Sequence, residues 1–253
     1  MSSDTKKLYF EPYARLLTML SEQLIKNEVV ALTEIVKNAY DADSPWVKIT
    51  FDNFDSNMVA AKDSKIIIED AGCGMSESTL KNDFINPPSA HKKIEKEAGK
   101  TTPLGRIYQG EKGIGRFSLF KLGKKITVIT KTKDDKKARR LELDLSVYED
   151  EFIKGNNKQY KLSEIPLEYI ESDDTDFSEK IFLDNCLRKR LNKGTIIIVE
   201  ELNDTWGKSK VEKLKSDLFS LMGNVYGESF GIYFFEGNAF VPTVEITEKK
   251  TLE

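Results

Sequence analysis

The chain has 253 residues, with 39 basic and 42 acidic side chains and a formal net charge of -3. This near balance gives no global argument for a nucleic-acid or anionic-membrane partner, and the length suits one large domain with a real core. A single histidine, His91, excludes zinc sites built on several histidines, and two cysteines make no disulfide framework. With no long apolar run and no apolar signal segment in Met1–Phe10, we expect a cytoplasmic protein.

Apolar spacing predicts helices mixed with strands along the chain. Helices are expected over residues 9–26, 29–40, 76–84, 113–122 and 209–226. Strands are expected over residues 47–51, 65–69, 126–132, 139–145, 194–200 and 230–235. Residues 53–64 are expected to form a hairpin loop, Gly123 to cap the helix before it, and residues 149–192 show no clear pattern. This order does not give the regular alternation of a doubly wound fold, so a mixed sheet with helices on one face is predicted.

Three polar residues interrupt the second predicted helix. Glu34 and Asn38 are four residues apart and share a face, and Asp41 follows near its C-terminal end. Such a stripe is typical of a solvated helix face, but it also suits a cavity. There a Glu can deprotonate water and an Asn can give a neutral oxygen to Mg²⁺.

A second motif follows the strand at 65–69. Asp70 ends this buried run, and Gly72 and Gly74 come directly after it. Glycines at such a place indicate either a plain tight turn or backbone that passes close to a ligand. In the second case, the carboxylate can accept a hydrogen bond from the exocyclic amine of adenine, whereas guanine has a carbonyl at that position.

A third motif is the glycine-rich stretch that runs from Gly105 to Phe117. Gly105 and Gly110 have the spacing of a phosphate loop, but Glu111 stands where that motif needs lysine. No G-x-G-x-x-G follows a strand, so a dinucleotide-binding turn is excluded too. The stretch is either a flexible linker or an anion site formed by glycine-rich backbone that enters a helix.

The order of these motifs resembles the GHKL (Bergerat-fold) ATPase superfamily, closest to its MORC-like and bacterial chaperone-like branch. The resemblance covers roughly residues 27–202. It rests on Glu34-x-x-x-Asn38-Ala-x-Asp41-Ala, Asp70-x-Gly72-x-Gly74, Gly110-x-Lys112-Gly113-x-Gly115 and Gly194-Thr195. It implies an α+β fold, a two-layer sandwich whose mixed β-sheet is covered on one face by helices, with an ATP lid.

The resemblance also implies roles for the matched positions. Glu34 would be the catalytic base, Asn38 would bind Mg²⁺, and Asp70 would recognise adenine. Gly72, Gly74 and Met75 would shape the adenine pocket, and Thr195 would support Asp70. The other expected nucleotide-binding residues are Asp41, Lys92, Gly110, Lys112, Gly113, Ile114, Gly115, Arg116 and Phe117.

The predicted organisation is an ATP-binding domain over residues 1–205, with its lid at about 86–110, and a C-terminal helix and strand over 206–253 that could begin a second domain. The resemblance implies slow, Mg²⁺-dependent ATP hydrolysis that drives lid closure and homodimerisation, in DNA-related, chaperone-like or phage-defence work. Any DNA or protein client would bind through regions outside this chain, and no membrane partner is expected.

Two alternatives stay open. One is a nucleotide-binding sensor or scaffold with little turnover. The other is the catalytic domain of a histidine kinase. It is weakened because His91 lies in the predicted lid and no helix that bears a histidine precedes the ATP-binding motifs.

Overall fold

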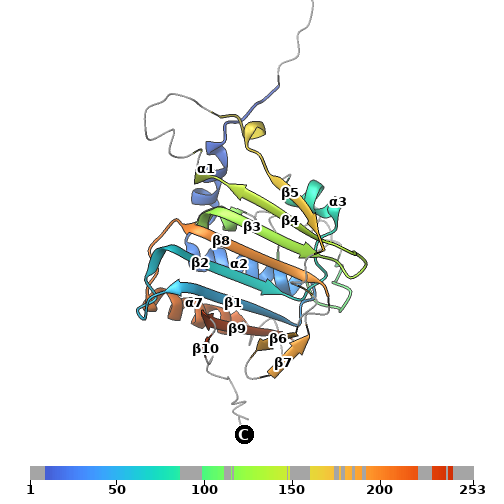
Figure 1. Ribbon diagram of the computed structural model, residues 1–253, viewed down its shortest axis with the longest axis vertical. Coiled ribbons are helices and arrows are strands. Elements are labelled where there is room, and N and C mark those ends of the chain that lie inside the picture. Colours follow the sequence, from blue (N-terminus) through green and yellow to red (C-terminus); the bar gives the residue numbers. More distant parts are fainter. Residues whose placement is uncertain are drawn as a thin grey trace, which may run out of the picture.

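The computed structural model of the chain is a two-layer arrangement of one large sheet and a set of helices (Figure 1). It describes residues 9–85, 99–110, 115, 117–146, 148, 160–173, 177, 180–183, 186–189, 192–221, 230–237 and 239–241. Helices α2, α5 and α7 lie on one face of the sheet, as the sequence predicts (Figure 1). Within these residues, no helix is both long and apolar enough to cross a membrane.

The large sheet is mixed, with the strand order β10-β9-β1-β2-β8-β3-β4-β5. Its neighbours pair antiparallel, except that β9 runs parallel to β1. Its strands are β1 (Trp46–Phe54), β2 (Ala60–Asp70), β3 (Gly123–Lys131), β4 (Ala138–Asp144), β5 (Glu168–Ser172), β8 (Gly194–Leu202), β9 (Gly231–Glu236) and β10 (Ala239–Val241). A separate antiparallel hairpin is formed by β6 (Lys180–Leu183) and β7 (Cys186–Lys189).

The helical layer is built around one amphipathic helix, α2 (Glu28–Asp41). The Asn27 side chain begins it by accepting a hydrogen bond from the Val30 amide at 2.9 Å, which satisfies one of the free amides of the first turn. The other helices are α1 (Arg15–Leu24), α3 (Glu77–Thr79), the π-helix η1 (Leu80–Phe84), α5 (Phe117–Leu122), the 3-10 helix η2 (Leu162–Glu164) and α7 (Lys208–Leu221).

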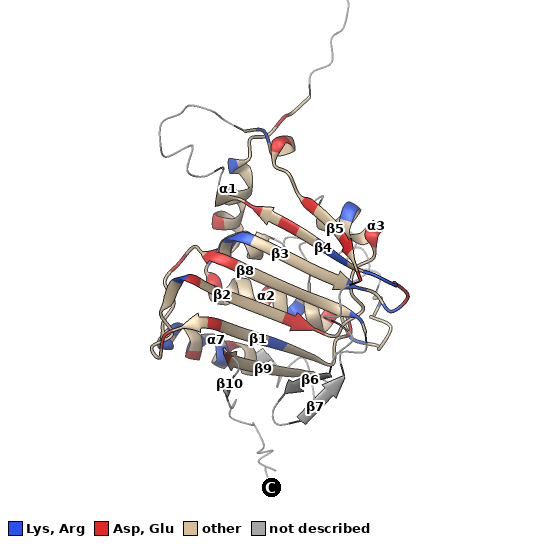
Figure 2. Ribbon diagram, viewed as in Figure 1, with Lys and Arg blue, Asp and Glu red and all other residues tan. Residues whose placement is uncertain are grey.

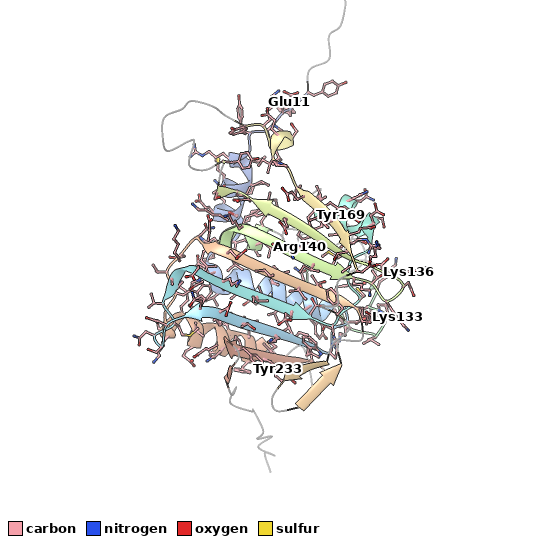
Figure 3. The ribbon with its side chains drawn as sticks, in the orientation of Figure 1. Glu11, Lys133, Lys136, Arg140, Tyr169 and Tyr233 are labelled. Atoms are coloured by element: carbon pink, nitrogen blue, oxygen red, sulfur yellow. The ribbon has the colours of Figure 1, made fainter. Side chains whose placement is uncertain are left out.

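The sheet face opposite the helices carries charges of both signs along its strands (Figure 2). Lys48 pairs with Glu69 at 2.9 Å across β1 and β2, and Lys125 pairs with Glu201 at 2.9 Å across β3 and β8. Lys133 and Lys136 lie at the tip of the β3–β4 hairpin, beyond the ends of the strands (Figure 3). Such interspersed charges are typical of a solvated surface.

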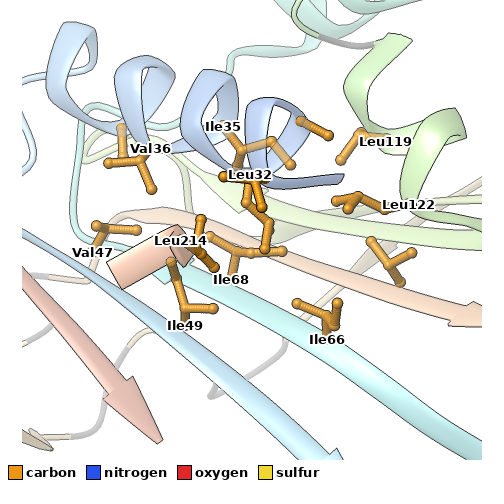
Figure 4. Close-up of a cluster of buried hydrophobic side chains, with 14 of the residues drawn as sticks. Leu32, Ile35, Val36, Val47, Ile49, Ile66, Ile68, Leu119, Leu122 and Leu214 are labelled. Atoms are coloured by element: carbon orange, nitrogen blue, oxygen red, sulfur yellow. The ribbon is translucent and has the colours of Figure 1, made fainter. Parts of the chain in front are cut away.

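The main core lies between the helices and the sheet (Figure 4). Leu32 and Val36 of α2 are fully buried, and they face Ile66 and Ile68 of β2 across the two layers. Strand residues alternate between faces, so the same alternation that builds this core also points Asp70, two residues after Ile68, toward the helices. The packing of the sheet thus fixes the direction of a predicted site residue.

The C-terminal elements share this core. Leu214 and Leu218 of α7 are 0% exposed, and Phe234 of β9 is buried in the same cluster as Leu32 and Val47. Because β9 also pairs with β1 from Trp46–Gly231 to Phe51–Glu236, no break in packing falls at residue 205. The described part of residues 206–253 is built into the same two layers as the rest.

Several local predictions need correction. Residues 53–64 are not all loop, because β1 extends to Phe54 and β2 begins at Ala60. Gly123 does not cap α5: it begins β3, and a Cβ there would lie 2.6 Å from the Glu200 carbonyl oxygen, so glycine lets two strands approach. The polar stretch after residue 149 contains β5, an edge strand that pairs with β4.

Candidate functional site

The polar stripe predicted on α2 is present as a half-buried face of that helix. Glu34 and Asn38 lie on it, while Ile35 and Ala39 beside them are buried in the core. The Glu34 carboxylate pairs with the Lys37 ammonium at 2.7 Å, and the Glu34 side chain keeps 27% of its exposure. The predicted base Glu34 and the predicted Mg²⁺ ligand Asn38 therefore lie on a half-buried face of one helix.

The turn after β2 packs against the C-terminal end of α2. The Cys73 amide donates a hydrogen bond to the Ala42 carbonyl at 2.8 Å, and a Cβ on Gly72 would lie 2.7 Å from the Ala42 side chain. Gly74 has a φ of +69°, and a Cβ there would lie 2.1 Å from the Lys131 carbonyl oxygen. Glycine is thus required at both positions, which bring the second motif onto the first.

A row of polar side chains crosses the end of the sheet beside this turn. Asp70 of β2 is paired in register with Thr195 of β8, and Thr195 is paired with Thr130 of β3. The Thr130 hydroxyl donates to the Gly194 carbonyl at 3.0 Å, lies 3.2 Å from the Thr195 hydroxyl and accepts from the Met75 amide at 2.9 Å. Thr130 therefore ties together two segments that were predicted to bind adenine.

The Asp70 carboxyl is the most strongly perturbed acid of this row. Its Oδ1 accepts a hydrogen bond from the Gly72 amide at 2.7 Å. Burial raises the pKa of Asp70 to about 7, although the backbone hydrogen bonds from Gly72 and Thr195 oppose the shift. A buried acid whose pKa lies so far from its ordinary value is typical of a functional site.

The described part of the predicted lid, residues 99–110, is attached to the end of α2. The Asp41 carboxylate accepts hydrogen bonds from the amides of Gln109 at 2.7 Å and Gly110 at 3.0 Å. The Arg106 guanidinium donates to the Tyr40 carbonyl at 3.0 Å and to the Ser44 carbonyl at 2.7 Å. It also lies 4.6 Å from the centre of the Tyr40 ring. The third motif thus begins on the same helix end as the other two.

The far end of the glycine-rich motif also lies against α2. A Cβ on Gly115 would come within 2.8 Å of the Asn38 side-chain nitrogen, so Gly115 lies directly against this amide and a larger residue would require the Asn38 side chain to move. Phe117 begins α5 and its side chain lies in the core, against Phe120. The predicted residues Lys92, Lys112, Gly113, Ile114 and Arg116 lie outside the described residues.

Sequence reasoning missed two residues that build this site. Thr130 stands inside a predicted strand, and only its register against Thr195 shows that its hydroxyl faces the same way. Arg106 is 8% exposed and holds the last turn of α2, but it looked like one more residue of a glycine-rich stretch. Thr130 belongs to no local motif, and nothing in the glycine-rich stretch singles out Arg106, so no sequence signal marks either residue.

Comparisons with known proteins agree with this geometry. A family model described as histidine kinase-, DNA gyrase B-, and HSP90-like ATPase matches residues 26–175, more than half of the chain. The chaperone protein HtpG of Campylobacter jejuni subsp. doylei is 26% identical over 217 residues, which cover 81% of this chain and 34% of that protein.

Two further relatives match shorter stretches. HtpG of Clostridium acetobutylicum is 30% identical over 141 residues, 51% of this chain and 22% of that protein. The putative type II restriction enzyme HgiDII of Herpetosiphon aurantiacus is 34% identical over 104 residues, 41% of this chain and 15% of that protein. The chain thus spans between 15% and 34% of the length of these curated relatives.

The three motifs, the mixed sheet with its helical layer and the family match lead to one conclusion. The chain belongs to the histidine kinase-, DNA gyrase B- and HSP90-like ATPase family, as an ATP-binding ATPase domain.

Proposed function

We propose that this domain binds ATP with Mg²⁺ at the C-terminal end of α2 and hydrolyses it slowly. Closure of the lid over about 86–110 and homodimerisation would follow ATP binding. The proposal rests on one observation above all: three sequence motifs meet at one helix end, through the Asp41, Ala42 and Asn38 contacts described above. DNA or protein clients would be served by parts of the whole protein beyond this chain.

Adenine would be recognised at the Asp70 end of the sheet. The Asp70 carboxyl offers an acceptor to the exocyclic amine, and the glycine turn with Met75 supplies a close wall for the ring. The Thr130 hydroxyl donates its one hydrogen bond to the Gly194 carbonyl. It would therefore position Thr195 and Met75 and would not donate to the base. Guanine, which has a carbonyl where adenine has an amine, would be disfavoured.

The phosphates would lie beside Asn38 and the glycine-rich motif. The residues present fit Mg²⁺, because Asn38 offers a neutral side-chain oxygen on a half-buried helix face and lies against Gly115, the last glycine of the glycine-rich motif. Mg²⁺ takes few protein ligands and many from water and phosphate, and when bound it neutralises charge on the triphosphate.

Glu34, one helical turn before Asn38, would then act as the general base. The oxygen of a water molecule attacks the γ-phosphorus, the bond from that phosphorus to the β–γ bridging oxygen breaks, and the Glu34 carboxylate takes the proton of the water. The products are ADP and phosphate. The partial exposure of Glu34 and its position on a rigid helix are what this role requires.

Steady-state ATPase assays and calorimetry on Glu34→Ala test the proposal. We expect turnover to fall by about a hundredfold or more, as for removal of a general base, while the Kd for ATP changes little. Asp70→Asn should instead lose ATP binding, because the amide presents a donor toward the adenine amine.

The matched control is Glu22→Ala, which removes an exposed carboxylate from α1. It should leave turnover and affinity unchanged. If Glu34→Ala hydrolyses ATP at the wild-type rate, Glu34 is not the base, and a sensor or scaffold with background turnover describes the domain better.

A further inference from the structure

Asp41 is the last residue of α2, and its carboxylate is committed to the backbone of another segment. One oxygen accepts from the Gln109 amide at 2.7 Å and the other from the Gly110 amide at 3.0 Å. We propose that Asp41 is a positioning residue: it fixes Gly110, the first residue of the Gly110-x-Lys112-Gly113-x-Gly115 motif, and so sets how tightly the domain binds the triphosphate. This inference rests on the proposed function and deepens it.

The contacts argue against a direct role for Asp41 on the nucleotide. The residue is only 7% exposed, and both carboxylate oxygens already have backbone donors. A carboxylate turned toward a triphosphate would also repel it, since both groups are negative. By accepting from two amides, Asp41 acts on the substrate through the backbone that it holds. The proposal therefore gives Asp41 an indirect role at the nucleotide, in place of the direct contact that the resemblance implies.

The two described ends of the glycine-rich motif both lie on α2. Gly110 is held by Asp41, and Gly115 packs against Asn38, three residues earlier on the helix. Residues three apart on a helix are neighbours on its surface. Asp41 thus places the start of the motif beside the predicted metal ligand, at the place where phosphate charge would lie.

Asp43 offers a matched comparison on the same segment. Its carboxylate accepts from the Thr102 hydroxyl and from the Leu104 amide at 3.1 Å. It therefore holds residues 102–104, several residues before the motif begins. If the effect of Asp41 came only from general attachment of residues 99–110, both aspartates would matter equally.

The test is calorimetric titration of ATP with Mg²⁺, and of adenosine, into wild type, Asp41→Ala, Asp41→Asn and Asp43→Asn. Leaving two half-buried amides without their acceptor should let Gly110 move, so we expect Asp41→Ala to weaken ATP binding about tenfold to a hundredfold. Asp41→Asn keeps one acceptor oxygen and should lose about tenfold or less. Adenosine affinity should stay within about twofold in all variants, because its site is at Asp70, and Asp43→Asn should keep the wild-type ratio of the two affinities.

The outcomes separate the two proposals. A wild type that binds neither ligand overturns the proposed function. A wild type that binds ATP, with an unchanged ATP-to-adenosine affinity ratio in Asp41→Ala, overturns the positioning role alone, and so does an equal change of that ratio in Asp43→Asn. If Asp41→Ala fails to bind adenosine because it does not fold, the ratio measured for Asp41→Asn decides.

Discussion

At the scale of single residues, the Asp70 carboxyl lowers the stability of the folded protein as the pH rises above its ordinary pKa. Its carboxyl is desolvated at the end of a buried strand, and two backbone amides and the charge of Lys193 compensate this only in part. Its pKa rises from 3.8 to about 7, so the folded protein keeps a proton that the unfolded chain releases at much lower pH. The folded state therefore loses stability as the pH rises through this window.

This linkage predicts a pH-dependent difference between wild type and Asp70→Asn without nucleotide. The variant has no proton to release at this position, so its stability should lack the loss that wild type suffers between about pH 4 and 7. Relative to wild type, the variant should gain up to about 3 kcal/mol between pH 5 and pH 8. Urea unfolding at the two pH values measures this, and a constant difference would show that Asp70 is ionised normally.

At the scale of elements, α7 and β9 belong to the same two layers as the predicted ATP-binding motifs and do not form a separate unit after them. Lys210 near the start of α7 pairs with Glu28 at 3.2 Å and with Asp204 at 2.9 Å, and Glu28 is only 2% exposed at the start of α2. The pairing with Lys210 lowers the pKa of Asp204 to about 2. Through these ion pairs, Lys210 links the start of α7 to the start of α2.

We therefore expect a core substitution in α7 to weaken the whole fold. Leu214→Ala removes a side chain that is 0% exposed in the core shared with α2 and should lower the free energy of unfolding by about 2–5 kcal/mol. Denaturant unfolding should keep a single transition that moves to lower urea, whereas the exposed Lys213→Ala should change stability by less than about 0.5 kcal/mol. Two separate transitions, with only one of them shifted, would instead indicate an independent C-terminal domain.

Elements with a strong pattern could be predicted from the sequence, and others could not. The apolar period of α2 and the buried run of β8 gave both elements to within a few residues. Strand β5 was missed because it lies at the edge, with Glu168 to Glu171 all exposed, so it lacks the alternation of a half-buried strand.

In the site, each motif could be predicted alone, but the Thr130 and Arg106 contacts depend on register and packing between distant segments.

At the scale of the whole molecule, the domain spans only 15% to 34% of its curated relatives. Its own surface offers a sheet face that carries charges of both signs around a buried apolar cluster under Phe177. It also offers exposed apolar side chains near the start of the described chain, which include Tyr9, Phe10 and Met19. Apolar side chains that are exposed together are typical of contact surfaces. They fit the proposal that ATP binding brings two copies together.

Size-exclusion chromatography with light scattering tests this assembly. With Mg²⁺ and a non-hydrolysable ATP analogue, we expect the mass of wild type to double at micromolar concentration. Asp70→Asn, which should not bind the analogue, should keep the mass of a single chain under the same conditions. A wild type whose mass does not change with saturating analogue would contradict nucleotide-dependent dimerisation of this domain.

The parallel pairing of β1 with β9 has a consequence for how the chain matures. Trp46 is paired with Gly231 and Phe51 with Glu236. Strand β1 is therefore synthesised about 180 residues before its partner β9 leaves the ribosome. Until then, β1 is an unpaired edge with apolar side chains, which is a risk for aggregation. Long-range pairing of this kind also slows folding. Folding during synthesis should therefore stall before the last step, and the nascent domain is expected to need protection until β9 has emerged.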